Sequence, residues 1–159
     1  MPDKTKPILV AVDFSEFSEQ ALLWAARAAR SFGAPLVVLY VVHDPSSAPG
    51  YDKLERPGKK HLRRSEEAAS EMMEDFLDQM TKKHRKLLDK MSRRLVVGLP
   101  ITRILEVADD VDAQLIVMGS HGRTGLPHLL LGSKAERVAQ LSPIPVTIVK
   151  SSASAPGAD

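Results

Sequence analysis

Runs of consecutive apolar residues alternate along this chain with stretches whose apolar residues recur at helical spacing. A continuous apolar and β-branched run is typical of a strand covered on both faces, whereas recurrence every three or four residues is typical of a helix that packs by one side. The predicted strands span residues 7–12, 35–42, 95–97, 114–118 and 146–150. The predicted helices span residues 16–32, 65–91, 101–111 and 132–141.

This alternation predicts an α/β domain with an open, parallel, doubly wound sheet and helices on both faces. The strands are expected to be parallel because a helix separates each strand from the next. A chain of 159 residues is long enough for one domain with a sizeable core and too short for two. We expect the domain to span residues 1–150. Residues 43–60, rich in proline, glycine and serine, predict an exposed loop, and the small, polar residues 151–159 a disordered C-terminal tail.

Composition and charge narrow the range of partners. The formal net charge is only +2 at pH 7, so the sequence predicts neither nucleic acid nor an anionic membrane as the main partner. The basic run over residues 82–94 favours a solvated helix end over a binding patch. Without cysteine, disulfides, thiolate metal sites and cysteine nucleophiles are excluded. Residues 1–6 are polar and the apolar run after them is short, so we expect no signal peptide, no transmembrane helix and a cytoplasmic protein.

Candidate chemistry concentrates directly after the predicted strand 114–118. Residues 119–125 read Gly-Ser-His-Gly-Arg-Thr-Gly, and Gly132 with Ser133 opens a predicted helix. Glycines between a strand and a helix start bring bare backbone N–H groups up to an anion, and the helix dipole adds positive potential. The carboxyl ends of parallel strands share one edge of the sheet, so Asp13, Val41 and Gly119 are expected near one another, where ligands bind in such folds. The sequence therefore predicts a site that holds a phosphate.

The individual residues of this stretch have alternative interpretations. Gly122 and Gly132 are expected to permit positive φ and close approach of a phosphate, or else only to shape a turn and a helix entry. Arg123 would place its guanidinium on a phosphate or remain in solvent. Lys134 would offer its backbone N–H, with its ammonium on a phosphate or in water. His121 is expected to be an exposed or supporting residue and not a catalyst.

Together these motifs resemble the universal stress protein family, in its nucleotide-binding branch. The resemblance rests on the spacing Gly119-x2-Gly122-x9-Gly132-Ser133, the preceding Leu-Ile-Val-Met, the Val-Ala-Val-Asp-Phe-Ser near the start and the closing Pro-Ile-Pro-Val-Thr-Ile-Val. It extends from about Lys6 to Lys150. It implies a Rossmann-like fold of the adenine nucleotide alpha hydrolase type, with strand order 3-2-1-4-5.

The resemblance also implies an ATP site, in which AMP or ADP could replace ATP. Asp13 would help to bind the nucleoside, the backbone of Val41 would meet the adenine edge, and Met118 with Gly119 would lie against the ribose. The backbone at Gly122 and the helix start would hold the phosphates, with a further donor from the Ser133 hydroxyl. The predicted nucleotide-binding residues are Asp13, Val41, Met118, Gly119, Gly122, Arg123, Gly132, Ser133 and Lys134.

Several other chemistries lack their motifs. The chain has Gly132-Ser133-Lys134 where a P-loop needs G-x4-G-K-[ST], and Gly119 to Gly122 is one residue short of a nucleophile elbow. The five histidines show no metal-ligand spacing, and Asp109, Asp110 and Asp112 resemble an ordinary polar helix end. We therefore expect no protein-held metal, and Mg²⁺ to accompany ATP mainly on its phosphates.

Three functions remain open at this point. The favoured one is a nucleotide-dependent regulatory protein of the stress response; the alternatives are a slow ATPase or phosphotransferase, with Asp13 or His121 orienting water, and a nucleotide-free dimeric scaffold. The resemblance implies a homodimer in which the final strands, Val146 to Val149, pair antiparallel. An apolar edge strand there is consistent with such pairing or with a protected edge on a monomer.

Overall fold

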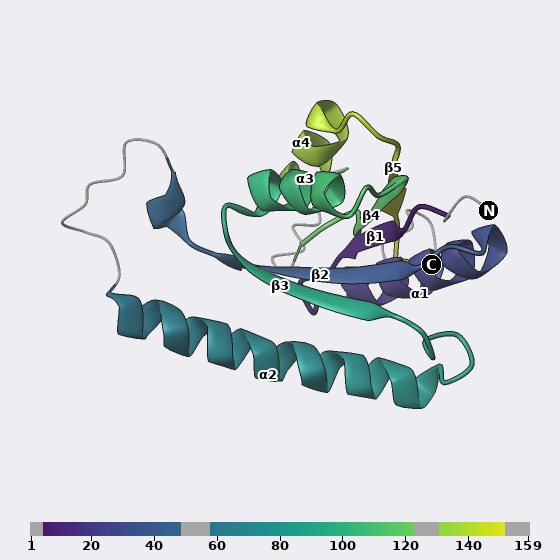
Figure 1. Ribbon diagram of the computed structural model, residues 1–159, viewed down its shortest axis with the longest axis horizontal. Coiled ribbons are helices and arrows are strands. Elements are labelled where there is room, and N and C mark those ends of the chain that lie inside the picture. Colours follow the sequence, from purple (N-terminus) through teal and green to yellow (C-terminus); the bar gives the residue numbers. More distant parts are fainter. Residues whose placement is uncertain (1–4, 49–57, 123–130, 152–159) are drawn as a thin grey trace, which may run out of the picture.

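The computed structural model describes residues 5–48, 58–122 and 131–151. Within them, one parallel sheet has the predicted strand order β3-β2-β1-β4-β5. Helices α1 and α2 cover one face of the sheet, and α3 and α4 cover the other (Figure 1). The strands are β1 (Ile8–Ala11), β2 (Leu36–His43), β3 (Ser92–Gly98), β4 (Leu115–Gly119) and β5 (Val146–Val149). The helices are α1 (Glu16–Phe32), α2 (Lys59–Lys83), α3 (Pro100–Asp110) and α4 (Ser133–Leu141), with a 3₁₀ turn, η1 (Pro45–Ser47).

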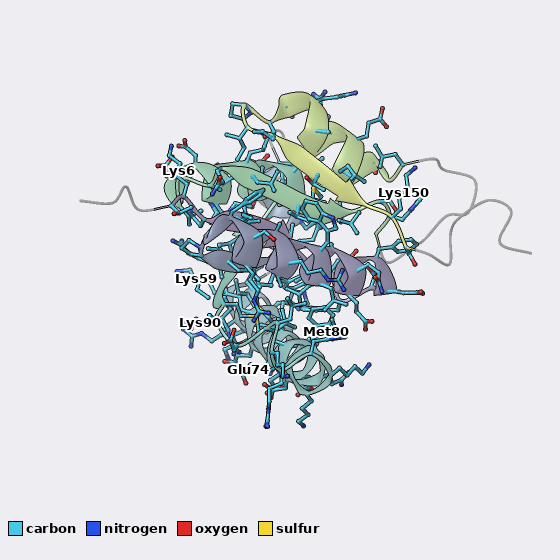
Figure 2. All side chains as sticks on the ribbon, turned by 90° about the vertical axis from the view of Figure 1, so that its right-hand side faces the viewer. Lys6, Lys59, Glu74, Met80, Lys90 and Lys150 are labelled. Carbon is cyan, nitrogen blue, oxygen red and sulfur yellow. The ribbon has the colours of Figure 1, made fainter. Side chains whose placement is uncertain are left out.

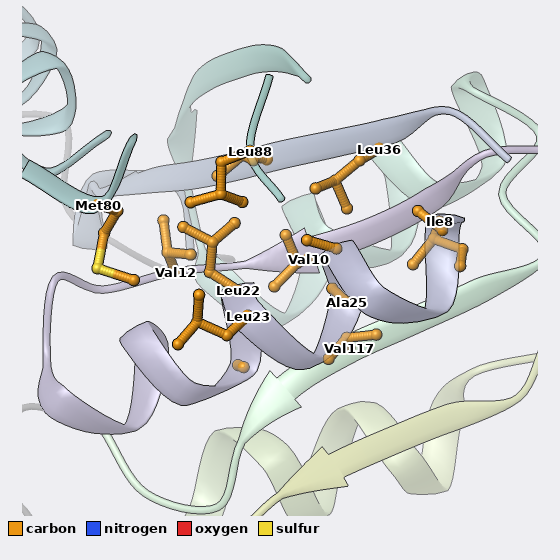
Figure 3. Close-up of a cluster of buried hydrophobic side chains, with 14 of the residues drawn as sticks. Ile8, Val10, Val12, Leu22, Leu23, Ala25, Leu36, Met80, Leu88 and Val117 are labelled. Carbon is orange, nitrogen blue, oxygen red and sulfur yellow. The ribbon is translucent and has the colours of Figure 1, made fainter. Parts of the chain in front are cut away.

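Alternate residues of the central strands pack into two separate cores. In β1, Ile8 and Val10 point toward α1 and α2, where Leu22 of α1 is fully buried (Figure 3). Leu9, between them, packs in the second core with Ile104 of α3. Both faces of β1 are therefore shielded from water, which is why the strand reads as an uninterrupted apolar run. Burial of a side chain such as Leu22 contributes about 1.5–3 kcal/mol to folding.

Helix α1 has the predicted bounds because both of its ends carry strong local signals. Ser15 caps the first turn, where its side chain accepts a hydrogen bond from the Ser18 N–H at 3.2 Å. Gly33 ends the helix in the left-handed conformation, with φ of 62°. In Figure 2, α1 lies between α2 below and the layer of β5 and α4 above.

The start of α2 differs from the sequence prediction. The helix was expected from residue 65, because Ser65 followed by two glutamates resembles a capped first turn, but it begins at Lys59 after the cap Gly58. Ser65 instead lies inside the helix, and its hydroxyl donates to the His61 carbonyl oxygen one turn earlier at 3.0 Å. The predicted loop 43–60 is accordingly shorter; it also contains η1, and residues 49–57 lie outside the described part.

The end of α2 and the length of β3 were also predicted incorrectly. The helix ends at Lys83, not near residue 91, and the turn after it buries Leu88 in the first core. Strand β3 begins at Ser92, three residues before the expected start, because Arg93 and Arg94 continue the pairing with β2 through backbone groups alone. The basic run 82–94 is therefore divided among a helix end, a turn and a strand.

The end of the described chain contacts the start of α1. Ser151, the first residue of the predicted C-terminal tail, is buried, and its hydroxyl lies 3.4 Å from Glu16 Oε1 of α1; residues 152–159 are outside the described part. Among the helices that are described, none combines the length and the apolar character needed to cross a bilayer.

Candidate functional site

A cavity of about 310 Å³ opens at the carboxyl edge of the sheet, where β1 has β2 on one side and β4 on the other. This is the point at which the chain, after winding outward to β3, returns past β1 to form β4, the expected ligand position in such sheets. Eight of the nine predicted site residues line the cavity. They are Asp13, Val41, Met118, Gly119, Gly122, Gly132, Ser133 and Lys134; the ninth, Arg123, lies outside the described residues.

Asp13 follows β1 and has its carboxylate fixed by the start of α1. Its Oδ1 accepts hydrogen bonds from the Ser15 N–H at 3.0 Å, from the Ser18 hydroxyl at 2.5 Å and from the Ser15 hydroxyl. Phe14 makes the turn between strand and helix with φ of 66°, in the left-handed region that β-carbon-bearing residues rarely adopt. A Cβ atom on Gly122 would lie 3.3 Å from the other oxygen, Oδ2. One carboxylate oxygen is therefore held by the protein and the other faces the site.

The backbone of Val41 is open toward the site because β2 extends beyond β1. The register ends with Ala11 opposite Leu39, and the Leu39 carbonyl oxygen accepts from the Val12 N–H at 2.9 Å. Backbone groups of successive strand residues point alternately to the two sides, so the N–H and C=O of Val41 point the same way as those of Leu39. At Val41 no described strand residue remains opposite them on that side. The N–H and C=O groups of Val41 can therefore form hydrogen bonds with the edge of a planar ligand.

The glycines of the site serve through lack of a side chain and not through positive φ. Among the described glycines only Gly33 and Gly98 have positive φ, so that part of the expectation for Gly122 and Gly132 was wrong. A Cβ atom on Gly119 would lie 2.8 Å from Phe17 Cβ in α1, and one on Gly132 would lie 3.1 Å from the Ser120 carbonyl oxygen. Close approach of two backbone segments explains these two glycines.

The start of α4 presents backbone N–H groups at the mouth of the cavity. The cap residue Gly132 supplies no side-chain hydrogen bond, and its own N–H donates to the Ser120 carbonyl oxygen at 2.6 Å. The first-turn N–H groups of Ser133, Lys134 and Ala135 have no intrahelical acceptor, because the helix does not extend further back. All three residues line the cavity. This end of the cavity carries the positive potential of a helix start.

Ser120 and His121 connect β4 to the site. Ser120 is only 1% exposed, and its N–H donates to the Val149 carbonyl oxygen of β5 at 2.9 Å. Its hydroxyl lies 3.0 Å from His121 Nδ1, and the His121 ring packs on the Phe17 ring with the centroids 5.1 Å apart. His121 thus lines the cavity with an imidazole whose orientation is set by two neighbours.

The sequence interpretation missed the apolar walls of the cavity. Leu39 and Ile104 line it from β2 and α3, and Pro100 lies at the start of α3. The position of Pro100 directly after a strand was a usable signal, because it places the start of α3 at the carboxyl edge. Nothing in the local pattern marks Leu39 or Ile104 as different from other core residues. The remaining missed lining residues are Ala11, Val12, Ser18, Tyr40, His43 and Ala135.

The polar groups of the cavity suit an anion with an uncharged portion better than a bare cation. Asp13 and Lys134 are its charged side chains in the described part, with His43 and His121 beside them. No group of three or more histidine, aspartate or glutamate residues in the described ranges is placed to hold a metal ion. Apolar side chains of β2 and α3 and the N–H groups at the start of α4 line the same cavity, and β2 and β4 lie on opposite sides of β1.

Comparisons with known proteins agree with this architecture over nearly the whole chain. The model of the universal stress protein family matches residues 4–150. Universal stress protein MJ0531 of Methanocaldococcus jannaschii is 36% identical over 149 residues, which cover 91% of this chain and 82% of the relative.

Two solved structures share the fold and contain nucleotides. A universal stress protein in complex with cAMP has a TM-score of 0.62 at 25% identity, covering 93% of this chain and 98% of its own. The universal stress protein of Archaeoglobus fulgidus in complex with dAMP has a TM-score of 0.58 at 25% identity, covering 92% and 99%. With the family model and a relative above 30% identity both spanning the domain, this chain belongs to the universal stress protein family.

Proposed function

We propose that this protein binds an adenine nucleotide, preferentially ATP, in the cavity at the carboxyl edge of the sheet, and acts as a nucleotide-dependent regulatory protein in the form of a homodimer. The observation that carries the proposal is that different parts of the cavity lining suit different parts of a nucleotide. Leu39, Ile104 and the open backbone of Val41 suit a base, and the N–H groups at the start of α4 suit phosphates. Mg²⁺ would be held mainly by the phosphates.

The family relatives support the choice of ligand class. Both solved structures were determined in complex with an adenine nucleotide, cAMP in one and dAMP in the other. Each of these ligands joins an adenine to a sugar and one phosphate, the same order of groups as the apolar wall, the Asp13 oxygen and the helix start in this chain. In this arrangement Asp13 Oδ2 would accept a hydrogen bond from a ribose hydroxyl.

Isothermal titration calorimetry with Mg-ATP and with AMP tests the proposal directly. Native mass spectrometry of the purified protein adds whether an adenine nucleotide co-purifies, and at what stoichiometry per subunit. We expect saturable binding of one nucleotide per subunit. Absence of heat and of any stabilisation at millimolar nucleotide would contradict the proposal, because binding to the folded state must raise its stability.

An Asp13→Asn variant tests the assigned orientation. Asparagine retains an oxygen to accept from Ser15 and Ser18, and replaces the outward oxygen with an amide that cannot accept. We expect an affinity loss of about tenfold, equivalent to about 1.4 kcal/mol, with an unchanged fold. The matched control is Asp109→Asn, an exposed carboxylate at the far end of α3, which should bind as the unaltered protein does.

The homodimer proposal rests on the contrast between the two edge strands. The four residues of β5 are all half-buried apolar or β-branched residues, and no described strand pairs with the outer edge. The opposite edge, β3, carries exposed Arg93 and Arg94, which discourage edge pairing. The geometry therefore supports pairing of two copies through β5.

The register identifies which β5 residues to alter. The carbonyl oxygens of Pro145 and Val149 accept from β4, so the backbone groups of Val146 and Ile148 point outward. Proline at Ile148 removes an outward N–H and leaves the bonds to β4 in place. We expect Ile148→Pro to be a folded monomer by light scattering and circular dichroism. A folded variant that stays dimeric would place the interface elsewhere.

A further inference from the structure

We propose that Lys134 determines how many phosphates the site prefers, by adding to the cavity mouth a cation that polyphosphates reach and a monophosphate does not. This inference rests on the proposed nucleotide site and specifies its ligand. Lys134 is exposed at the second position of α4 and lines the cavity. Its neighbours Ser133 and Ala135 offer only backbone N–H groups and one hydroxyl to an anion.

The position of Lys134 is electrostatically unfavourable for the helix itself. The first turn of a helix carries partial positive charge, so a cation there destabilises the helix by about 0.3–1 kcal/mol. Helix α1 shows the usual solution, with Glu16 and Glu19 in its first turn, whereas α4 combines one acidic residue, Glu136, with the lysine. A lysine at this position in α4 therefore needs a reason outside the stability of the helix.

Among the described residues, no neighbouring group forms an ion pair with Lys134. The residues one turn further along α4 are Arg137, also a cation, and Val138. Glu136 lies two residues away, a spacing at which helix side chains do not face each other. In the described part of the structure no carboxylate lies within ion-pair distance of Lys134. Within the described ranges, the ammonium therefore has no carboxylate partner at a cavity that the apolar Leu39 and Ile104 also line.

The layout of the cavity separates the first phosphate from those that follow it. With the base against Leu39 and Ile104, the first phosphate would meet the N–H groups at the start of α4. Additional phosphates must extend outward past Ser133 and Lys134, both of which are exposed. The flexible four-carbon stem of lysine lets the ammonium follow them. The ligand class that matches this arrangement is a nucleoside di- or triphosphate.

Calorimetric titrations of AMP, ADP and ATP, each with Mg²⁺, test this inference on the full-length chain. In the unaltered protein we expect affinity to rise from AMP to ATP. Lys134→Gln should weaken ATP binding about tenfold, the effect of one charge-assisted hydrogen bond, and leave AMP binding within about twofold. Lys134→Arg keeps the charge and should restore most of the preference. The matched control is Arg137→Gln, which removes a cation one turn away that does not line the cavity and should change neither affinity.

Four results would overturn the inference. Equal losses for AMP and ATP in Lys134→Gln would mean that the side chain supports the fold and not the outer phosphates. An equal effect of Arg137→Gln would mean that only the overall charge of α4 matters. Binding of none of the three nucleotides by the unaltered protein would overturn the proposed function itself. Binding with a flat AMP-to-ATP ratio would overturn the role of Lys134 and the preference for ATP, and would leave the proposed binding of an adenine nucleotide standing.

Discussion

Helices α1 and α4 begin at the same edge of the sheet, on opposite faces, and their first turns differ in capping and in charge. The start of α1 is saturated by its own chain, with Ser15 as the cap and Glu16 and Glu19 in the first turn. The start of α4 has Gly132 as its cap, with no side-chain hydrogen bond, and carries the cation Lys134 in the first turn beside a single acidic residue, Glu136. Both helix starts have the same dipole, so helix geometry alone does not determine which of them suits an anion. The difference between them lies in the side chains of the first turn.

The two helices also approach the end of β4 and the residues that follow it in the same manner. Phe17 of α1 packs on Gly119, where an added Cβ would lie 2.8 Å from Phe17 Cβ and 3.0 Å from the Phe17 backbone. The start of α4 packs on Ser120 and His121, where a Cβ on Gly132 would lie 3.1 and 3.2 Å from backbone atoms. Glycine positions each helix, but only the α4 contact also forms the proposed phosphate end.

The largest effect is expected from Gly119→Ala, which separates α1 from β4. The new methyl group would overlap a backbone that cannot move independently, and such overpacking costs about 1–3 kcal/mol of folding free energy. Urea unfolding measures the loss as a lower midpoint at constant slope. An unchanged midpoint would show that the approach of α1 to Gly119 is looser than the structure indicates.

Gly132→Ala is expected to cost less stability and to weaken nucleotide binding as well. The contacts are slightly longer, 3.1 Å to the Ser120 carbonyl oxygen, so α4 must shift by a few tenths of an ångström. The matched control is Gly58→Ala, because Gly58 is also a helix cap with similar backbone angles and has open space around it. We expect Gly132→Ala to lower the free energy of unfolding by about 1 kcal/mol more than Gly58→Ala does, as in mild overpacking. Of the two variants, only Gly132→Ala should lower the affinity for ATP.

Ser133→Asp makes the start of α4 resemble that of α1. A carboxylate in the first turn should stabilise the helix by about 0.3–1 kcal/mol and at the same time repel phosphates at the mouth of the cavity. We therefore expect a higher melting temperature together with an ATP affinity lowered by about tenfold or more. A higher melting temperature combined with a lower ATP affinity is the result that supports an electrostatic difference between the two helix starts.

The control for this variant is Ser133→Asn, which has nearly the same size and no charge. It should leave ATP affinity much closer to that of the unaltered protein than Ser133→Asp does. If both variants weaken binding equally, the space at Ser133 matters and the charge does not, and the distinction between the two helix starts loses its electrostatic basis.

The sequence predicted the fold well where the signal was local or repeated. The apolar strands and the bounds of α1 are confirmed, because buried parallel strands are apolar throughout and because Ser15 and Gly33 mark both ends of the helix. The strand order, which the family resemblance implied, is confirmed as well. The α2 prediction was wrong at both ends. Ser65 bonds backward within the helix instead of capping it, and Leu88 continues the helical apolar spacing from a turn.

The residues of the candidate site also differ in whether the sequence could predict them. Residues next to strand ends or in the glycine motif could be placed from the sequence, since parallel strands bring their carboxyl ends together. Leu39 and Ile104 could not, because a core residue and a cavity wall have the same pattern until the elements are packed. The reason for Gly119 also required the packed structure, because Phe17, which approaches it, lies about a hundred residues earlier in the chain.

The smallest effect is expected at the saturated helix start, from Glu16→Gln in α1. Removing one carboxylate from the first turn should lower stability by about 0.3–1 kcal/mol, and less at high salt. Glu16 does not line the cavity, so ATP affinity should stay within about twofold of the unaltered value. Chemical denaturation and calorimetry on the same preparation measure both quantities. A large loss of ATP affinity would mean that the start of α1 takes part in binding, and the functional difference between the two helix starts would then be one of degree.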